Sequence, residues 1–257
     1  MPAFALARRL RAGETVYGAW CMIGSPVVAE TIAREGFAAV VLDAQHGLWD
    51  VSSLVAGAGA VNHAGAAPIV RVPLNDFAMV SRALDFCAEA IIAPMINSAD
   101  DARHFAAAAK YPPFGERSWG PLRAMAMQAP RSTPVDYLRE ANDGTLAFAM
   151  IESAAALGNV DAIAATPGID ALFVGPYDLA TALSSGKAQD VQAPAVEQAI
   201  DRICTAAKMA GKVPGIYCRD AESAVAMAKR GFRFVVAGND LTTLRGATVA
   251  QLKALKS

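Results

Sequence analysis

The sequence predicts a single (β/α)8 barrel, a TIM barrel, that spans residues 1–257. Short segments rich in Val, Ile, Phe and Ala recur along the chain, and each is followed by a Gly, Pro or Asp cluster and then by a longer helical pattern. Eight such units can be counted. Barrels of this class typically use about 250 residues, and no linker-like break in composition indicates a second domain.

The predicted strands are nearly continuous in apolar residues. They run from Val16 to Cys21, Ala38 to Asp43, Pro68 to Val72, Ala90 to Pro94, Leu146 to Ile151, Ala171 to Val174, Val213 to Tyr217 and Phe234 to Ala237. Such segments indicate burial on both faces, as in a parallel sheet covered by helices, and eight successive units can close on themselves. This pattern favours a closed barrel over an open sheet.

The segments between the strands are rich in alanine and predict helices. Among them are Val27 to Glu35, Ala99 to Lys110, Ala193 to Ala210 and Ala221 to Arg230, and several end at a Gly that suits a helix C-cap. Residues 3–12 are expected to form an amphipathic helix. The longest irregular stretch runs from Tyr111 to Pro134, and a loop of that length in a compact domain is usually functional.

Composition excludes several classes of partner. Hydrophobic residues make up 54% and charged residues 18%, the net charge is −1, and no run of Lys or Arg is present. Nucleic acid is therefore not expected as a partner. No apolar segment approaches the roughly 20 residues that a membrane span needs. The four cysteines are scattered, which predicts neither a disulfide framework nor a structural zinc and suggests a cytoplasmic protein.

Two carboxylates fall where adjacent predicted strands end. Glu152 follows the fifth strand and Asp178 the sixth. Active sites of such barrels gather at the carboxyl ends of the strands, and carboxylates with no Cys or His beside them suit Mg²⁺ or Mn²⁺. The alternatives are that Glu152 caps a loop and that Asp178 caps a helix beginning near Leu179.

His46 follows the second predicted strand and lies three residues after Asp43. This spacing lets the carboxylate orient the imidazole as a general base. The alternative is a loop histidine satisfied by backbone. His63 and His104 fall in or near helical stretches, where a solvated or packed histidine is expected.

Arg71 ends the otherwise apolar third strand. A guanidinium that points into a barrel mouth is costly unless it meets an anion, so we expect Arg71 to stabilise negative charge. The alternative is a purely structural pair with Glu152 or Asp178. None of the lysines closes a strand, which argues against Schiff-base or pyridoxal phosphate chemistry and favours an enolate held by a metal.

As a set, these motifs resemble the HpcH/HpaI aldolases, the class II pyruvate aldolases. The similarity covers nearly the whole chain. Its motifs are Asp43-Ala44-Gln45-His46-Gly47, Val70-Arg71-Val72-Pro73, Ala93-Pro94-Met95, Arg103 with Lys110-Tyr111-Pro112-Pro113, Gly115-Glu116-Arg117, Ile151-Glu152 and Phe173-Val174-Gly175-Pro176-Tyr177-Asp178-Leu179.

The resemblance implies a reversible cleavage of 4-hydroxy-2-oxo acids to pyruvate and an aldehyde. It implies that Glu152 and Asp178 bind a divalent metal, Mg²⁺, Mn²⁺ or Co²⁺, that His46 and Asp43 form an acid/base dyad, and that the protein is a homo-oligomer, typically a hexamer. The residues expected to contact substrate are Arg71, Gly175, Pro176, Tyr177, Asp178, Trp20 and Met150. We place the aldehyde half near Trp119, Gly120, Pro121 and Arg123, with Trp20 and the Gly238-Asn239 turn as further walls.

Three positions depart from the family pattern. Gln45 stands where Glu often precedes the histidine, Met150 where many members have Gln, and Tyr177 where a smaller residue is common. These changes bear on substrate choice. The alternative functions are oxaloacetate decarboxylation or CoA-ester cleavage by the same enolate chemistry, and a non-catalytic barrel that binds a keto acid. A CoA-ester lyase would want a basic groove, which the sequence does not indicate.

Overall fold

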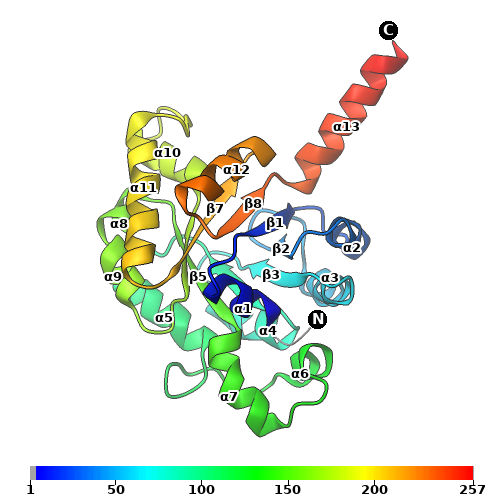
Figure 1. Ribbon diagram of the computed structural model, residues 1–257, viewed down its shortest axis with the longest axis vertical. Helices are drawn as coiled ribbons and strands as arrows, with labels where there is room; N and C mark the ends of the chain where they lie inside the picture. The colour runs from blue at the N-terminus through cyan, green and yellow to red at the C-terminus, as the bar shows by residue number, and fades with distance from the viewer. Residues whose placement is uncertain (1–3, 257) are drawn as a thin grey trace.

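The eight strands form a closed, parallel barrel in the order β1 to β8 (Figure 1). The computed structural model describes residues 4–256. The strands are β1 Val16–Cys21, β2 Ala39–Asp43, β3 Ala67–Arg71, β4 Ala90–Ala93, β5 Leu146–Ile151, β6 Ala171–Val174, β7 Val213–Cys218 and β8 Phe234–Ala237. The predicted barrel is confirmed, and each predicted strand is present with ends that differ by at most one residue.

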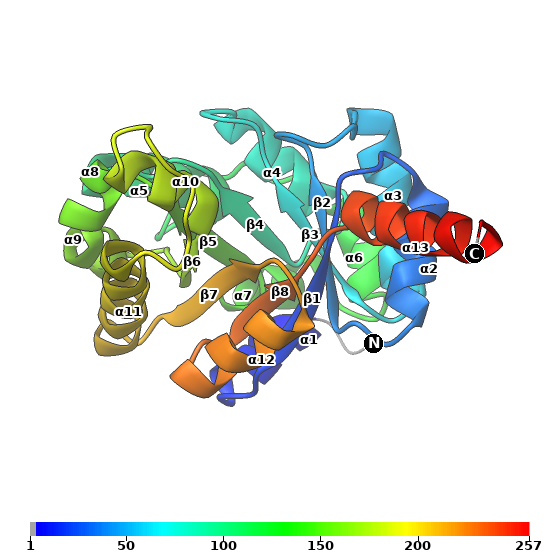
Figure 2. The same cartoon turned by 90° about the horizontal axis from the view of Figure 1, so that it is seen from above.

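Helices surround the barrel, as the view from above shows (Figure 2). They are α1 Ala5–Arg11, α2 Pro26–Arg34, α3 Val51–His63, α4 Phe77–Asp85, α5 Ala99–Ala109, α6 Leu122–Gln128, α7 Pro134–Gly144, α8 Ala154–Gly158, α9 Val160–Ala165, α10 Pro176–Leu183, α11 Pro194–Met209, α12 Ala221–Arg230 and α13 Asp240–Leu255. The helix predicted at residues 3–12 is shorter than expected, and residue 3 lies outside the described residues.

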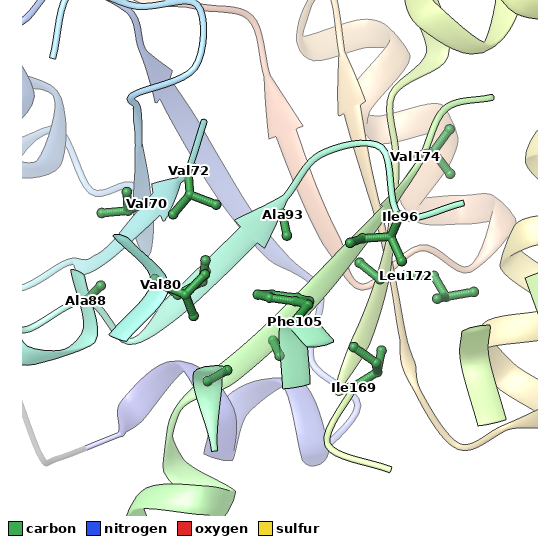
Figure 3. Close-up of a cluster of buried hydrophobic side chains, with 14 of the residues drawn as sticks. Val70, Val72, Val80, Ala88, Ala93, Ile96, Phe105, Ile169, Leu172 and Val174 are labelled. Carbon is green, nitrogen blue, oxygen red and sulfur yellow. The ribbon is translucent and has the colours of Figure 1, made fainter. Parts of the chain in front are cut away.

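Side chains alternate between the two faces of each strand because successive residues of a strand point in opposite directions. On β2, Ala39 and Val41 belong to the cluster inside the barrel, whereas Val40 and Leu42 belong to the cluster between the strands and the helices. Figure 3 shows part of this outer cluster, where Phe105 of α5 packs among the side chains of neighbouring strands. Burial on both faces explains the nearly continuous apolar strands of the sequence.

Large aromatic side chains fill the barrel interior. The ring of Phe234 lies 5.3 Å from that of Phe148 and 5.9 Å from that of Phe173, measured between centroids. Gly215 on β7 makes room for them, since a Cβ at this position would stand 2.8 Å from the Phe173 ring. The interior is therefore a packed core rather than a pore, and an active site can form only at one of its ends.

The N-terminal end of the barrel is closed by α1. Leu6, Ala7 and Leu10 of this helix join the inner cluster. The buried carboxylate of Glu89 accepts a hydrogen bond from the backbone N–H of Leu6 at 3.0 Å. With this end plugged, the carboxyl end of the barrel remains open for a site.

The segment from Tyr111 to Pro134 differs from its prediction in structure and in place. It contains helix α6. The ring of Trp119 in this segment lies 5.7 Å from the ring of Tyr111 and 6.2 Å from that of Tyr137, measured between centroids. Tyr137 in turn packs against Phe4, beside the α1 plug. A segment that joins the end of α5 to the start of β5 lies at the N-terminal end of the strands, so the expectation that it walls the active site is wrong for this chain's own barrel.

Helix α13 extends away from the barrel (Figure 1). Its first residue, Asp240, is buried and accepts hydrogen bonds from the backbone N–H groups of Met22 and Ile23, at 2.8 and 2.9 Å. Every described residue after Asp240 is exposed, Leu244 and Leu252 among them. Among residues 4–256, no helix is both long and apolar enough to cross a membrane.

Candidate active site

A cavity of about 600 Å³ lies at the carboxyl end of the barrel. Its lining consists of residues from the ends of seven strands and from the segments that follow them: Trp20, Met22, Asp43, His46, Arg71, Met150, Gly175, Pro176, Tyr177, Asp178, Tyr217, Arg219, Asn239 and Thr242. All the residues predicted to act in catalysis or to bind pyruvate or metal line it except Glu152. Of the residues predicted as walls for the aldehyde half, Trp20 and Asn239 line it, whereas Trp119, Gly120, Pro121, Arg123 and Gly238 do not. Glu152 lies directly behind Gly175, where a glycine Cβ would stand 2.5 Å from Glu152 Oε2.

The alternation along the strands explains why these residues meet. Inside the barrel, β2 contributes Ala39 and Val41, and the next residue of that parity is Asp43. The same step of two leads from Ile69 to Arg71 on β3. The carboxyl ends of all eight parallel strands meet at one rim of the barrel. The last inward-facing side chains of β2 and β3 therefore reach the same cavity.

Asp43 is the most enclosed charged group of the cavity, with no exposed surface. Arg71 donates to it from Nε at 2.8 Å and from Nη2 at 2.5 Å, and Trp20 donates from Nε1 at 3.1 Å. Burial alone would raise the pKa of Asp43, but the hydrogen bonds and charge of Arg71 outweigh it and hold the pKa below its ordinary value. Asp43 is therefore an anion that fixes the Arg71 guanidinium.

The structure corrects two expectations about this pair. Asp43 Oδ1 accepts from the backbone N–H of His46 at 3.2 Å, so it orders the turn rather than orienting the imidazole. The alternative that Arg71 pairs with Glu152 or Asp178 is also wrong, because its partner is Asp43. His46 itself is exposed at the cavity mouth.

Glu152 carries its carboxylate in a buried position with little compensation. Oε1 accepts a hydrogen bond from the backbone N–H of Met95 at 2.8 Å. Burial raises the pKa of Glu152 to about 7, and the negative charge of Asp178 adds to that rise. The N–H of Met95 and the charge of Arg71 act in the opposite direction, but burial outweighs them.

Asp178 lies in the first turn of α10, which begins at Pro176 with Gly175 as its N-cap. The helix thus begins before the position near Leu179 that the capping alternative required, and no side chain caps it. The N–H groups of Tyr177 and Asp178 in this first turn have no intrahelical acceptor, because the first four N–H groups of any helix lack one. Such N–H groups can donate to an anionic group, and here they lie in the same turn as Asp178.

Glu152 and Asp178 fit a divalent cation of the hard, oxygen-preferring kind. Both donors are carboxylates at the ends of adjacent strands, β5 and β6. Within residues 4–256 no third His, Cys, Asp or Glu joins them in a cluster, so substrate oxygens and water would complete the coordination. Because Gly175 has no side chain, Glu152 Oε2 can lie directly behind it, at a position that a Cβ would obstruct.

Three aromatic rings, from β1, β7 and α10, pack against one another along one wall of the cavity. Tyr217 lies 5.5 Å from Trp20 and 6.2 Å from Tyr177 between ring centroids. Tyr217 and Arg219 were not among the predicted site residues. Both share the inward parity of Gly215 on β7, so the same step of two that placed Asp43 and Arg71 would have found them.

The comparisons with known proteins agree on one family. Residues 17–247 match the model of the family described as HpcH/HpaI aldolase/citrate lyase. The chain is 35% identical over 247 residues to 5-keto-4-deoxy-D-glucarate aldolase of Klebsiella pneumoniae, covering 96% of this chain and 94% of that protein. It is 35% identical over 246 residues to hydroxypyruvate/pyruvate aldolase of Rhizorhabdus wittichii, covering 95% of this chain and 96% of that protein.

Solved structures agree with the sequence comparison. A crystal structure of a family protein from Burkholderia cenocepacia superimposes with a TM-score of 0.88 at 36% identity, covering 98% of this chain and 99% of that one. The barrel is thus shared along nearly its full length with proteins of this family.

Proposed function

The chain belongs to the HpcH/HpaI aldolase/citrate lyase family, and we propose that this member is a divalent-metal-dependent aldolase that reversibly cleaves 4-hydroxy-2-oxo acids to pyruvate and an aldehyde. The observation that carries the proposal is the pair Glu152 and Asp178. These two carboxylates interact electrostatically, and they lie next to the open first turn of α10 and to the cavity that Arg71 lines.

The pyruvate half fits between α10 and Arg71. The N–H groups of Tyr177 and Asp178 would donate to its carboxylate, and the positive end of the α10 dipole favours an anion there. Nε and Nη2 of Arg71 donate to Asp43. Nη1 has no hydrogen-bond partner among the described residues. This third nitrogen would face the keto oxygen, where charge develops in the enolate.

Glu152 and Asp178 would hold a divalent cation, which would supply Lewis-acid stabilisation of the negative charge of the enolate. The role of Asp43 is to hold Arg71 in place, so that no side chain needs to reorganise as the charge forms. Met150 and the ring of Trp20 add apolar surface to the lining of the cavity.

His46 is proposed as the proton carrier. It lies at the mouth of the cavity, close in sequence to Asp43, and it is the only histidine that lines the cavity within residues 4–256. In the cleavage direction it would accept the proton of the 4-hydroxyl group, and in the synthetic direction it would accept a methyl proton of pyruvate.

The identity of the metal, the assembly and the location extend the proposal. Mg²⁺, Mn²⁺ or Co²⁺ would suit two carboxylate ligands. A homo-oligomer, proposed as a hexamer, is supported by the exposed leucines of α13, which no other part of this chain covers among the described residues. Four buried, unpaired cysteines are compatible with the proposed cytoplasmic location.

The experiment that tests the proposed site uses the isosteric variants Glu152→Gln and Asp178→Asn. Exchange of the pyruvate methyl protons for deuterium, followed by nuclear magnetic resonance, reports enolate formation without any aldehyde. We expect metal-dependent exchange in the unmodified enzyme and at least a hundredfold slower exchange in both variants, about the cost of losing one preorganised charge contact. The variant Asp190→Asn, which changes an exposed carboxylate outside the main cavity, is the control. Unchanged exchange in Glu152→Gln would contradict the metal assignment.

A further inference from the structure

The far wall of the cavity carries one hydroxyl group whose hydrogen bonding is determined by its neighbours. Tyr217 at the end of β7 and Asn239 after β8 both line the cavity. The Nδ2 atom of Asn239 donates to the Tyr217 hydroxyl oxygen at 3.1 Å. The direction of this bond decides what the hydroxyl hydrogen can do.

The Asn239 amide cannot turn round without losing a helix cap. Its Oδ1 accepts from the backbone N–H of Thr242 at 2.9 Å, as the N-cap of α13. An amide whose oxygen is bound in this way must present its NH₂ group to Tyr217. The hydroxyl oxygen of Tyr217 therefore accepts, and its own hydrogen is left to donate elsewhere.

No second partner of the Tyr217 hydroxyl is found within residues 4–256, and the side chain is only partly buried at the cavity wall. Its ring is held between Trp20 and Tyr177, so the hydroxyl has a defined position. Burial raises the pKa of Tyr217, and the hydroxyl stays protonated at neutral pH. A fixed, neutral donor thus faces the cavity.

Trp20 separates this donor from the groups proposed to act on pyruvate. Its Nε1 donates to Asp43 on one side, and its ring meets the edge of the Tyr217 ring on the other. Tyr217 thus contacts the Trp20 ring and not Asp43, and only the charge of Arg71 reaches it. Because the pyruvate half is proposed to lie between Arg71 and α10, the Tyr217 hydroxyl is left for the part of the substrate beyond the new bond.

We propose that the Tyr217 hydroxyl donates a hydrogen bond to a hydroxyl or carbonyl oxygen on the carbon chain of the acceptor aldehyde, and so makes the enzyme prefer oxygenated aldehydes to their hydrocarbon analogues. This inference rests on the proposed aldolase function. A site that offers a polar partner discriminates against an analogue that lacks the matching group, because the partner is then left unpaired.

The test compares glycolaldehyde with acetaldehyde, which differ by one hydroxyl group, as acceptors for pyruvate. In the unmodified enzyme we expect a higher kcat/KM for glycolaldehyde. Tyr217→Phe should reduce this preference by about tenfold, the worth of one hydrogen bond to a substrate hydroxyl. Tyr17→Phe, which changes a more exposed tyrosine on β1, is the matched control and should leave the preference unaltered. An unchanged preference in Tyr217→Phe overturns the inference.

Asn239→Asp supplies a second, independent variant. Aspartate keeps an acceptor for the Thr242 cap, but its other oxygen would accept the Tyr217 hydrogen and withdraw it from the substrate. We expect the same loss of preference as in Tyr217→Phe, and an undiminished preference would contradict the geometry. Deuterium exchange of pyruvate distinguishes a failure of the proposed function from a failure of the role of Tyr217. Its absence in the unmodified enzyme overturns the proposed function, whereas exchange combined with an unaltered acceptor preference in the variants overturns only the role of Tyr217.

Discussion

Arg71 binds both carboxylate oxygens of Asp43, from Nε at 2.8 Å and from Nη2 at 2.5 Å, in a pair that is almost completely buried. Asp43 closes β2 and Arg71 closes β3, and the two residues are direct partners in the register of these strands. The bond therefore links the barrel wall to the site. It stabilises the fold only as long as both partners are present, because a buried charge without its partner is costly.

Arg71→Met should lower the free energy of unfolding by about 3–5 kcal/mol, the cost of leaving the Asp43 carboxylate buried and unpaired. The double variant Asp43→Asn, Arg71→Met should recover a large part of that loss, because no buried charge remains. Urea denaturation of the two proteins measures the difference. A double variant as unstable as the single one would show that Asp43 is not the group that makes the loss of Arg71 costly.

Gly175→Ala should impair the metal site while leaving a folded barrel. A Cβ at this position would stand 2.5 Å from Glu152 Oε2 and 2.7 Å from Met150 Cε, so the carboxylate must move. We expect at least tenfold weaker Mn²⁺ binding in calorimetry, because ligands displaced by a few tenths of an ångström no longer converge. Gly158→Ala, where the Cβ meets nothing within 4 Å, is the control, and equal Mn²⁺ affinity in both variants would contradict the placement of Glu152.

The stability of the metal-free protein should fall as the pH rises from about 4.5 to about 7. Glu152 ionises near 4.5 in the unfolded chain and at about 7 in the folded one, so the folded state binds the extra proton between these values. Its contribution is complete below the lower value and lost above the higher one, a change of the order of 3 kcal/mol.

Glu152→Gln carries no titrating group at this position and should lack that part of the pH dependence. Urea denaturation in EDTA at about pH 5 and about pH 8 measures the difference between the variant and the unmodified protein. The variant should gain relative stability at the higher pH. A constant difference across the two pH values would mean that Glu152 is not enclosed as the structure has it.

Helix α13 should carry an interface between copies of the chain. Leu241, Leu244, Leu252 and Leu255 follow one another at helical spacing on one face and are all exposed, from 44% to 85%. Leu244→Glu with Leu252→Glu should reduce the assembly mass in sedimentation, because charges at the centre of an interface are disfavoured. Thr243→Glu with Ala250→Glu adds the same charge to the opposite face and should not, and an unchanged mass in the leucine variant would place the interface elsewhere.

Much of the site could be predicted because strand alternation is a local property. Trp20, Asp43, Arg71 and Met150 share the parity of the apolar residues before them, and the carboxyl ends of parallel strands necessarily meet. Tyr217 obeys the same rule, but its aromatic ring resembles a core residue in the sequence, so the site prediction missed it.

The remaining errors concern contacts between distant residues or the ends of the barrel. Asp43 and His46 are close in sequence, yet Arg71, 28 residues away, takes the carboxylate. Trp119 and its neighbours were assigned to the mouth because the loop is long, although a connection from helix to strand returns to the N-terminal end. The order of the elements carries that information, and loop length alone does not.

Pyruvate release from 4-hydroxy-2-oxo acids, coupled to lactate dehydrogenase, tests the metal-dependent aldolase activity when the protein is treated with EDTA and then with Mg²⁺, Mn²⁺ or Co²⁺. We expect cleavage that EDTA abolishes and a divalent ion restores. Cleavage at an undiminished rate in EDTA would contradict the assignment of Glu152 and Asp178 as metal ligands, and with it the proposed mechanism.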